Sequence, residues 1–112
     1  MQIAILECTR RHGVTDDEIR AVLSYPVFRI RIAPRQEGSD PYLFIGSYDE
    51  DEPLIEVIAD LADPDKWIAF HAMMLRPATI QNLRLEMGLE LVVNELDLDN
   101  IVRQRPERRK GL

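Results

Sequence analysis

The chain has 112 residues, of which 46% are hydrophobic and 30% are charged. This composition is typical of one globular domain and unlike that of disordered chains. No apolar run approaches the roughly 20 residues that span a bilayer. The start also lacks the basic region of a secretory signal. We therefore expect a cytoplasmic protein that binds no membrane, and the lone Cys8 fits a reducing compartment.

The formal charge of −6 is unevenly distributed along the chain. Residues 103–112 hold five basic residues and Glu107, a charge of +4, which leaves −10 for residues 1–102. Such an acidic body disfavours broad nucleic-acid binding, because phosphate contacts need Lys and Arg. We predict one folded domain over residues 1–102 and a disordered basic tail over residues 103–112. The alternative for the tail is binding to RNA or to an acidic partner.

The first part of the chain predicts a strand, a turn and a capped helix. Residues 2–7 form a short apolar run typical of a strand, and residues 10–13 are typical of a turn. Thr15, with Glu18 three residues later, forms a capping-box pattern, and the helix should end before Pro26. Val14 and Ile19 occupy the positions of a hydrophobic staple at its start. Ile19, Val22 and Leu23 form its apolar stripe.

Four further strands and a second helix follow. The strands are expected at residues 27–33, 42–45, 54–61 and 67–74, the last of them central in the sheet because it is apolar on both faces. Pro77 suits a helix start and Gly88 a helix end. Residues 89–96 fit a third helix or a strand. This order predicts an α+β fold of two layers, a mostly antiparallel sheet of four or five strands with two or three helices on one face.

Several chemistries lack their sequence motifs. The chain has no glycine-rich phosphate loop, no zinc-ligand spacing and no Gly-x-Ser-x-Gly elbow. The acidic run at residues 49–52 lacks the spacing of a calcium loop and is typical of a solvated hairpin tip. We expect no cofactor and no metal ion.

Candidate catalytic groups occur in two places. Arg11 and His12 follow the first strand and offer a fixed positive charge and a group that titrates near neutrality, or simply a polar turn. His71 interrupts the apolar strand at residues 67–74, where alternation places it on one face with Trp67, Ala69 and Met73. It is either a buried histidine with a backbone partner or a group at a cleft.

Arg76 stands just before the predicted helix start, where a cation opposes the helix dipole. This placement predicts an anion or carboxylate partner, and Glu56 in the neighbouring strand is one candidate. A cation that stabilises phosphate charge and an imidazole that moves the 2′-hydroxyl proton are what RNA cleavage needs. His71 and Arg76 are therefore the primary pair, with Arg11 and His12 in support.

Several segments of the chain, taken in order, resemble those of a known family. They are Arg11-His12-Gly13-Val14 before a helix, a strand ending in Ile45-Gly46, the strand Leu54-Ile55-Glu56-Val57, and residues 68–73 followed by Leu75-Arg76-Pro77. Over roughly residues 3–87 the chain resembles the BrnT-like toxins of type II toxin–antitoxin systems. The resemblance implies a RelE-like ribonuclease fold, metal-independent RNA cleavage that stops translation, and a cognate antitoxin that covers the toxin.

The chain departs from that family in its charge. BrnT-like toxins are usually basic, whereas residues 1–102 carry −10, and the apolar stretch at residues 67–75 replaces the usual basic cluster of the last strand. Two functions therefore compete. One is an endoribonuclease toxin, and the other is a non-catalytic interaction or regulatory module with a degenerate toxin fold, which could form a homodimer. A small-ligand domain or an unrelated enzyme is the remaining alternative.

The charge and composition of the tail predict the effect of its removal. A chain truncated after residue 102 should melt at the same temperature as the full chain, because the tail has no apolar residue before Leu112 and can bury little surface. Thermal unfolding followed by circular dichroism measures this. Aggregation, or a clearly lower melting temperature, would show that the tail is structural.

Overall fold

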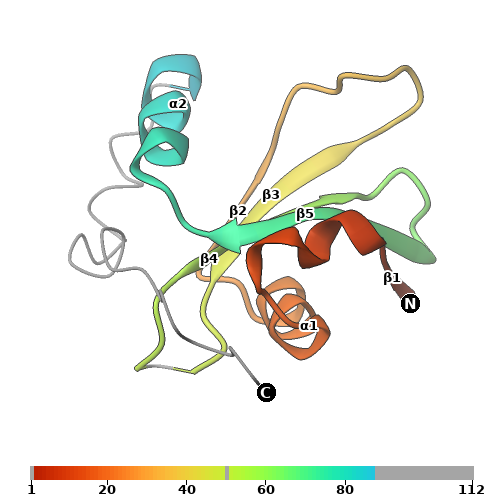
Figure 1. Ribbon diagram of the computed structural model, residues 1–112. Helices are drawn as coiled ribbons and strands as arrows, with labels where there is room; N and C mark the ends of the chain where they lie inside the picture. The colour runs from red at the N-terminus through yellow and green to blue at the C-terminus, as the bar shows by residue number, and fades with distance from the viewer. Residues whose placement is uncertain (1, 50, 88–112) are drawn as a thin grey trace.

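The computed structural model describes residues 2–49 and 51–87. Its elements, labelled in Figure 1, are β1 (Gln2–Ile5), the 3-10 helix η1 (Glu7–His12), α1 (Asp16–Ser24), β2 (Phe28–Arg31), β3 (Pro41–Gly46), β4 (Ile55–Asp60), β5 (Lys66–Met74) and α2 (Pro77–Met87). The expected third helix or strand at residues 89–96 and the tail at residues 103–112 lie outside the described residues.

The fold is α+β, with a five-stranded and mostly antiparallel sheet. The strand order is β1-β5-β4-β3-β2, so that β2 to β5 form an antiparallel meander and β1 lies parallel to β5 at one edge. The middle strand is β4 rather than β5, which was the strand expected to be central. The β5 strand is still internal, because β1 pairs with its first half and η1 follows β1 along it (Figure 1).

The chain passes from β1 at one edge to β2 at the other through α1. The apolar stripe of α1 is buried against β3, β4 and β5, in a cluster that includes Ile19, Val22, Phe44, Val57 and Ala69. This confirms the expected stripe. The sheet face that carries these residues is therefore the α1 face.

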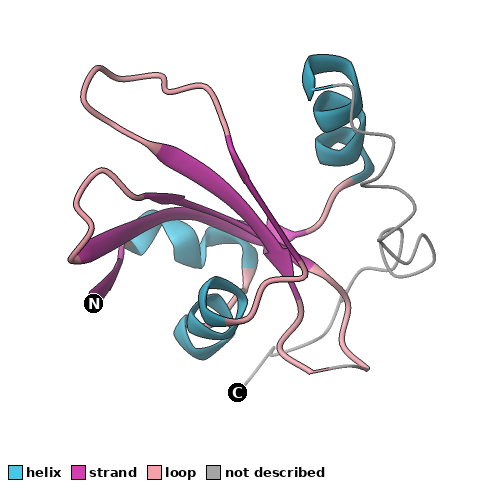
Figure 2. Ribbon diagram, turned by 180° about the vertical axis from the view of Figure 1, so that it is seen from behind, coloured by secondary structure: helices cyan, strands magenta, loops and turns pink. Residues whose placement is uncertain are grey.

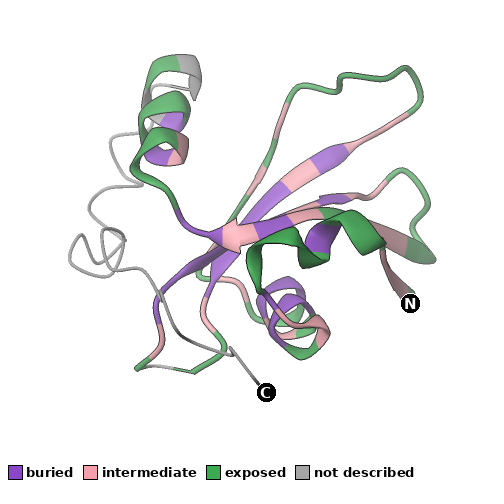
Figure 3. Cartoon of the chain, viewed as in Figure 1, coloured by how far each residue is buried: buried purple, intermediate pink, exposed green. Residues whose placement is uncertain are grey.

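The expectation that all helices lie on one face is wrong. Ile80 and Leu83 of α2 belong to a second cluster with Leu43 and Ile45 of β3, whose side chains alternate with Phe44 and so point to the opposite face. Figure 2 shows α1 and α2 on opposite sides of the sheet. Because β3 is apolar on both faces, each face needs its own cover, and Figure 3 shows buried segments in both helices.

The predicted turn at residues 10–13 is the end of η1. A 3-10 helix fits this short connection, and Gly13 ends it with φ of 75°, a left-handed conformation that glycine adopts at little cost. Thr9, in the middle of η1, is fully buried and donates its hydroxyl to the carbonyl of Leu6 at 2.7 Å. The segment therefore packs as a defined element against the edge of β5.

The capping box of α1 is present as predicted. The backbone N–H of Glu18 donates to Thr15 Oγ1 at 3.2 Å, and the backbone N–H of Thr15 donates to Glu18 Oε1 at 2.9 Å. Both staple residues, Val14 and Ile19, are buried. The start of α1 is thus set by sequence-local bonds, as the pattern indicated.

Removal of this cap should destabilise the protein measurably. Thr15→Ala should lower the free energy of unfolding by about 1 kcal/mol, because an amide of the first helical turn loses its acceptor. Urea denaturation measures the change, and Thr15→Ser, which keeps the hydroxyl, is the matched control. Equal stability of the alanine variant and the wild type would contradict a stabilising role for the cap.

Candidate functional site

A buried carboxylate lies at the centre of the candidate site. Glu56 of β4 is only 1% exposed, yet its neighbours in the strand are apolar. Its Oε2 contacts His71 Nε2 at 2.8 Å and accepts from Arg76 Nη2 at 2.9 Å. Its Oε1 accepts from Thr79 Oγ1 at 2.6 Å, from the backbone N–H of Arg76 at 3.1 Å and from Arg76 Nε at 3.3 Å. We call these four residues the Glu56 cluster.

The hydrogen bonds keep Glu56 ionised despite its burial. Burial is the largest single influence and raises the pKa of the carboxyl group. The hydrogen bonds from His71, Arg76 and Thr79 together outweigh it and lower the pKa of Glu56 to about 2. The same pairing raises the pKa of the Arg76 guanidinium. The cluster is therefore a charged pair at neutral pH.

The geometry explains the position of Arg76 before a helix. The Glu56 carboxylate lies at the N-terminus of α2, where a negative charge is favourable, and it neutralises the guanidinium that opposes the dipole. The expected carboxylate partner of Arg76 is thus confirmed as Glu56. Thr79, one turn into α2, joins the same carboxylate, so the cluster ties β4, β5 and α2 together.

His71 is on the other face of the sheet from the one predicted. Ile58 pairs with His71 whereas Ala59 pairs with Ala69, so Phe70 is the extra residue of a β-bulge in β5. Trp67 and Ala69 face α1, but beyond the bulge His71 and Met73 share the opposite face with Ile58 and Glu56. Uninterrupted alternation had placed His71 beside Trp67, and the bulge is the reason that this was wrong.

His71 and Arg76 share one hollow on the α2 face. This hollow of about 650 Å³ has apolar walls from Leu6, Ile58, Ile68 and Phe70, and it is lined in addition by Arg35 and Asp60. The side chains of His71 and Arg76 are 25% and 47% exposed. The sequence is compatible with a position of His71 either in the core or at a cleft. The structure places it at a cleft, with a carboxylate rather than a backbone partner.

The bonds to Glu56 determine which atoms remain for chemistry. An ionised carboxylate only accepts, so His71 Nε2 must carry a proton and, in the neutral ring, Nδ1 carries the lone pair. Arg76 uses Nε and Nη2 for Glu56, which leaves the N–H groups of Nη1 for another acceptor. The cluster thus offers one oriented base and one cation that can bind an anion.

The other two candidate residues are not in this hollow. Arg11 and His12 are exposed at the end of η1, and neither lines it. The neighbouring Arg10 is bound to Asp16 at 2.9 Å. The structure therefore brings His71 and Arg76 together and leaves Arg11 and His12 apart from them.

Sequence reasoning missed Thr79 and the role of the bulge. Thr79 had a weak signal, since it stands three residues after Arg76 at the start of a helix. Phe70 had none, because a bulge depends on the pairing of β4 with β5.

Two other features are absent from the described part of the chain. Residues 2–49 and 51–87 contain no group of three or more His, Cys, Asp or Glu side chains that could hold a metal ion. Within the same residues, no helix has the length and apolar character that crossing a membrane requires. Compared with known protein families, curated proteins and solved structures, the chain matches none.

The ionised Glu56 should stabilise the folded protein by an amount that depends on pH. Glu56→Gln should lower the free energy of unfolding at pH 7 by about 3 kcal/mol, because it removes the charge of a buried carboxylate that hydrogen bonds from His71, Arg76 and Thr79 stabilise. The folded pKa of about 2 lies below the ordinary 4.5, so this stabilisation is complete above pH 4.5 and is lost as the pH falls towards 2. Urea denaturation at pH 7, 4 and 2.5 should show the gap between variant and wild type closing.

Asp40→Asn is the matched control for this experiment. Asp40 forms an ion pair with Arg31 at 2.7 Å, but both side chains are substantially exposed, so the loss should stay below about 1 kcal/mol. A gap between Glu56→Gln and wild type that is constant from pH 7 to pH 2.5 would rule out the ionised carboxylate as its source.

Proposed function

We propose that this protein is an RNA-cleaving toxin of the BrnT-like kind, with a RelE-like fold, acting in the cytoplasm under the control of a cognate antitoxin. The observation that carries the proposal is the hollow that His71 and Arg76 share, where the hydrogen bonds found within residues 2–49 and 51–87 use neither His71 Nδ1 nor Arg76 Nη1. Three of the sequence segments that resemble the family meet there, since they contribute Glu56, His71 and Arg76.

The proposed chemistry needs no metal ion. His71 Nδ1 accepts the 2′-hydroxyl proton, the 2′-oxygen bonds to the adjacent phosphorus, and the bond from phosphorus to the 5′-oxygen breaks. The leaving 5′-oxygen takes a proton from water in the open hollow. Arg76 Nη1 stabilises the charge that develops on the phosphate oxygens, and Glu56 holds the imidazole in the useful tautomer. The products are a 2′,3′-cyclic phosphate and a 5′-hydroxyl.

A second function has its own support. Apolar side chains make up part of the lining of the hollow, and the chain carries a net charge of −6, which favours a protein partner over a polyanion at this face. In that case the Glu56 cluster is structural and fastens α2 to the sheet. The protein would then be a non-catalytic module that binds an antitoxin-like partner or a second copy of itself.

Cleavage of a labelled RNA in the presence of a chelator separates the two functions. The wild type should cut the RNA and arrest growth when expressed alone, and His71→Ala should reduce the cleavage rate about 100-fold or more. His71→Gln is the matched variant, because its amide can still donate to Glu56 while offering no base. His71→Gln should keep a wild-type melting temperature, whereas His71→Ala removes one donor from the buried Glu56 and should melt at a lower temperature while remaining folded under the assay conditions.

Three results would count against the catalytic proposal. They are no cleavage by the wild type, full activity of His71→Gln, and loss of activity only where the protein also unfolds. His12→Ala reports on the other candidate histidine. Because His12 lies outside the hollow, this variant should cut RNA at the wild-type rate, and a comparable loss would instead place the site at the end of η1.

A further inference from the structure

An arginine lies across three aromatic rings on the α1 face. The Arg29 guanidinium carbon is 4.8 Å from the ring centroid of Tyr42 and 5.4 Å from those of Phe44 and Trp67. Arg29 pairs with Phe44 in the sheet register, so both side chains point to the face that α1 partly covers. We call Arg29 and these three residues the Arg29 platform.

The platform depends on a small residue in the strand between its members. Tyr42 and Phe44 belong to β3 and Trp67 to β5, and β4 separates these strands. Tyr42 pairs with Ala59 of β4, whose methyl group leaves room for the rings to approach above it. The centroids of Phe44 and Trp67 are consequently only 5.6 Å apart, and the buried Phe44 ring lies 6.5 Å from that of Tyr42.

The guanidinium of Arg29 is held in place without using its hydrogen-bond donors. Arg29 is exposed, and in residues 2–49 and 51–87 it has no hydrogen bond or ion pair, in contrast to Arg31, which binds Asp40. The ring faces attract and orient the cation. Its N–H edges and its outer plane therefore remain available to a ligand.

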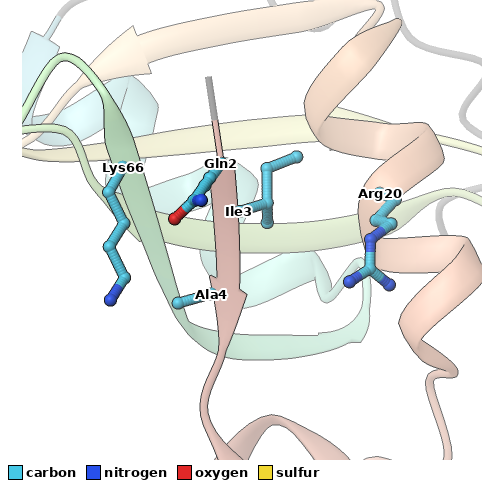
Figure 4. A pocket seen from close by; sticks show the side chains of 5 residues that line it. All are labelled: Gln2, Ile3, Ala4, Arg20 and Lys66. Atoms are coloured by element: carbon cyan, nitrogen blue, oxygen red, sulfur yellow. The ribbon is translucent and has the colours of Figure 1, made fainter.

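A second cation adjoins the platform across β1. A shallow hollow of about 360 Å³ is lined by Gln2, Ile3, Ala4, Arg20 and Lys66 (Figure 4). Ile3 is the register partner of Trp67, and Figure 4 shows its side chain on the same side of β1 as Arg20 of α1. Two cations therefore flank an apolar strip of this face. The strip consists of Trp67 and Ile3, with Arg29 at one end and Arg20 at the other.

We propose that the Arg29 platform binds single-stranded RNA. A base stacks on the outer plane of the Arg29 guanidinium, whose N–H edges donate to the phosphate of that nucleotide. A phosphate further along the strand is neutralised by Arg20. This site is independent of the proposed cleavage chemistry, because it lies on the α1 face and the Glu56 cluster lies on the other.

The chemistry of the platform selects this ligand over others. A cationic ligand such as an ammonium group would need to bind to the aromatic ring faces. Arg29 already occupies those faces, so they cannot form a cage for a second cation. A carboxylate could pair with Arg29 but has no ring to stack on it. A nucleotide can do both, because its base stacks on the plane of the guanidinium and its phosphate accepts hydrogen bonds from the N–H edges. Because the surrounding chain is acidic, only few phosphates can be bound, and the salt dependence should be shallow.

The single tryptophan of the chain makes this testable in solution. Trp67 is the only tryptophan, so its fluorescence reports on the platform alone. The full chain is titrated with a 2′-O-methyl octauridylate, which cannot be cleaved through the 2′-oxygen. We expect saturable quenching in 50 mM salt and a loss of affinity of about tenfold or more for Arg29→Ala.

Two further variants and a second probe keep the test specific. Arg29→Lys preserves the charge but not the plane, so it should also weaken binding, whereas Arg10→Ala removes a cation elsewhere and should not. An octaglutamate peptide of similar charge should quench at least tenfold less well. The proposal is overturned if the wild type is not quenched, if folded Arg29→Ala or Arg29→Lys binds as the wild type does, or if the peptide binds as tightly as the oligonucleotide.

Discussion

The ionised carboxylate of Glu56 is the interaction on which the other features of this structure depend. A carboxylate that is 1% exposed is tolerated only when its oxygens are satisfied, and here side chains from β5 and α2 supply the donors. In meeting that requirement the chain fastens α2 to the sheet, turns Arg76 towards the carboxylate and orients His71. Removal of the charge would leave Arg76 without its ionic partner, and the apolar contacts of Ile80 and Leu83 would then have to hold α2 on the sheet.

The bulge at Phe70 converts this structural requirement into a candidate site. Without it, His71 would point to the α1 face and Glu56 would lose one partner. The carbonyl of Phe70 instead accepts from the Cys8 thiol of η1 at 3.1 Å, so the bulge is supported from the sheet edge. Bulges commonly redirect a side chain next to a functional site, and this one brings an imidazole to the rim of an apolar hollow.

The two faces of the sheet therefore have different chemical character. The α2 face combines a partly apolar hollow with an ion pair whose carboxylate is buried, and the α1 face carries an arginine held on three rings. Each arrangement contains few cationic side chains, as expected for a chain whose net charge is −6. Two of the cations that contact a proposed ligand are positioned by specific partners, Glu56 for Arg76 and the aromatic rings for Arg29.

The sequence by itself determined the local features. The cap at Thr15, the apolar stripe of α1, the strands of the meander and the need of Arg76 for a carboxylate partner all depend on residues close in the chain or on one unfavourable charge. Tertiary structure alone decided which face each group occupies. The bulge at Phe70, the position of α2 and the platform around Arg29 arise from pairing between strands distant in sequence, and a shift of one residue there moves every following side chain to the other face.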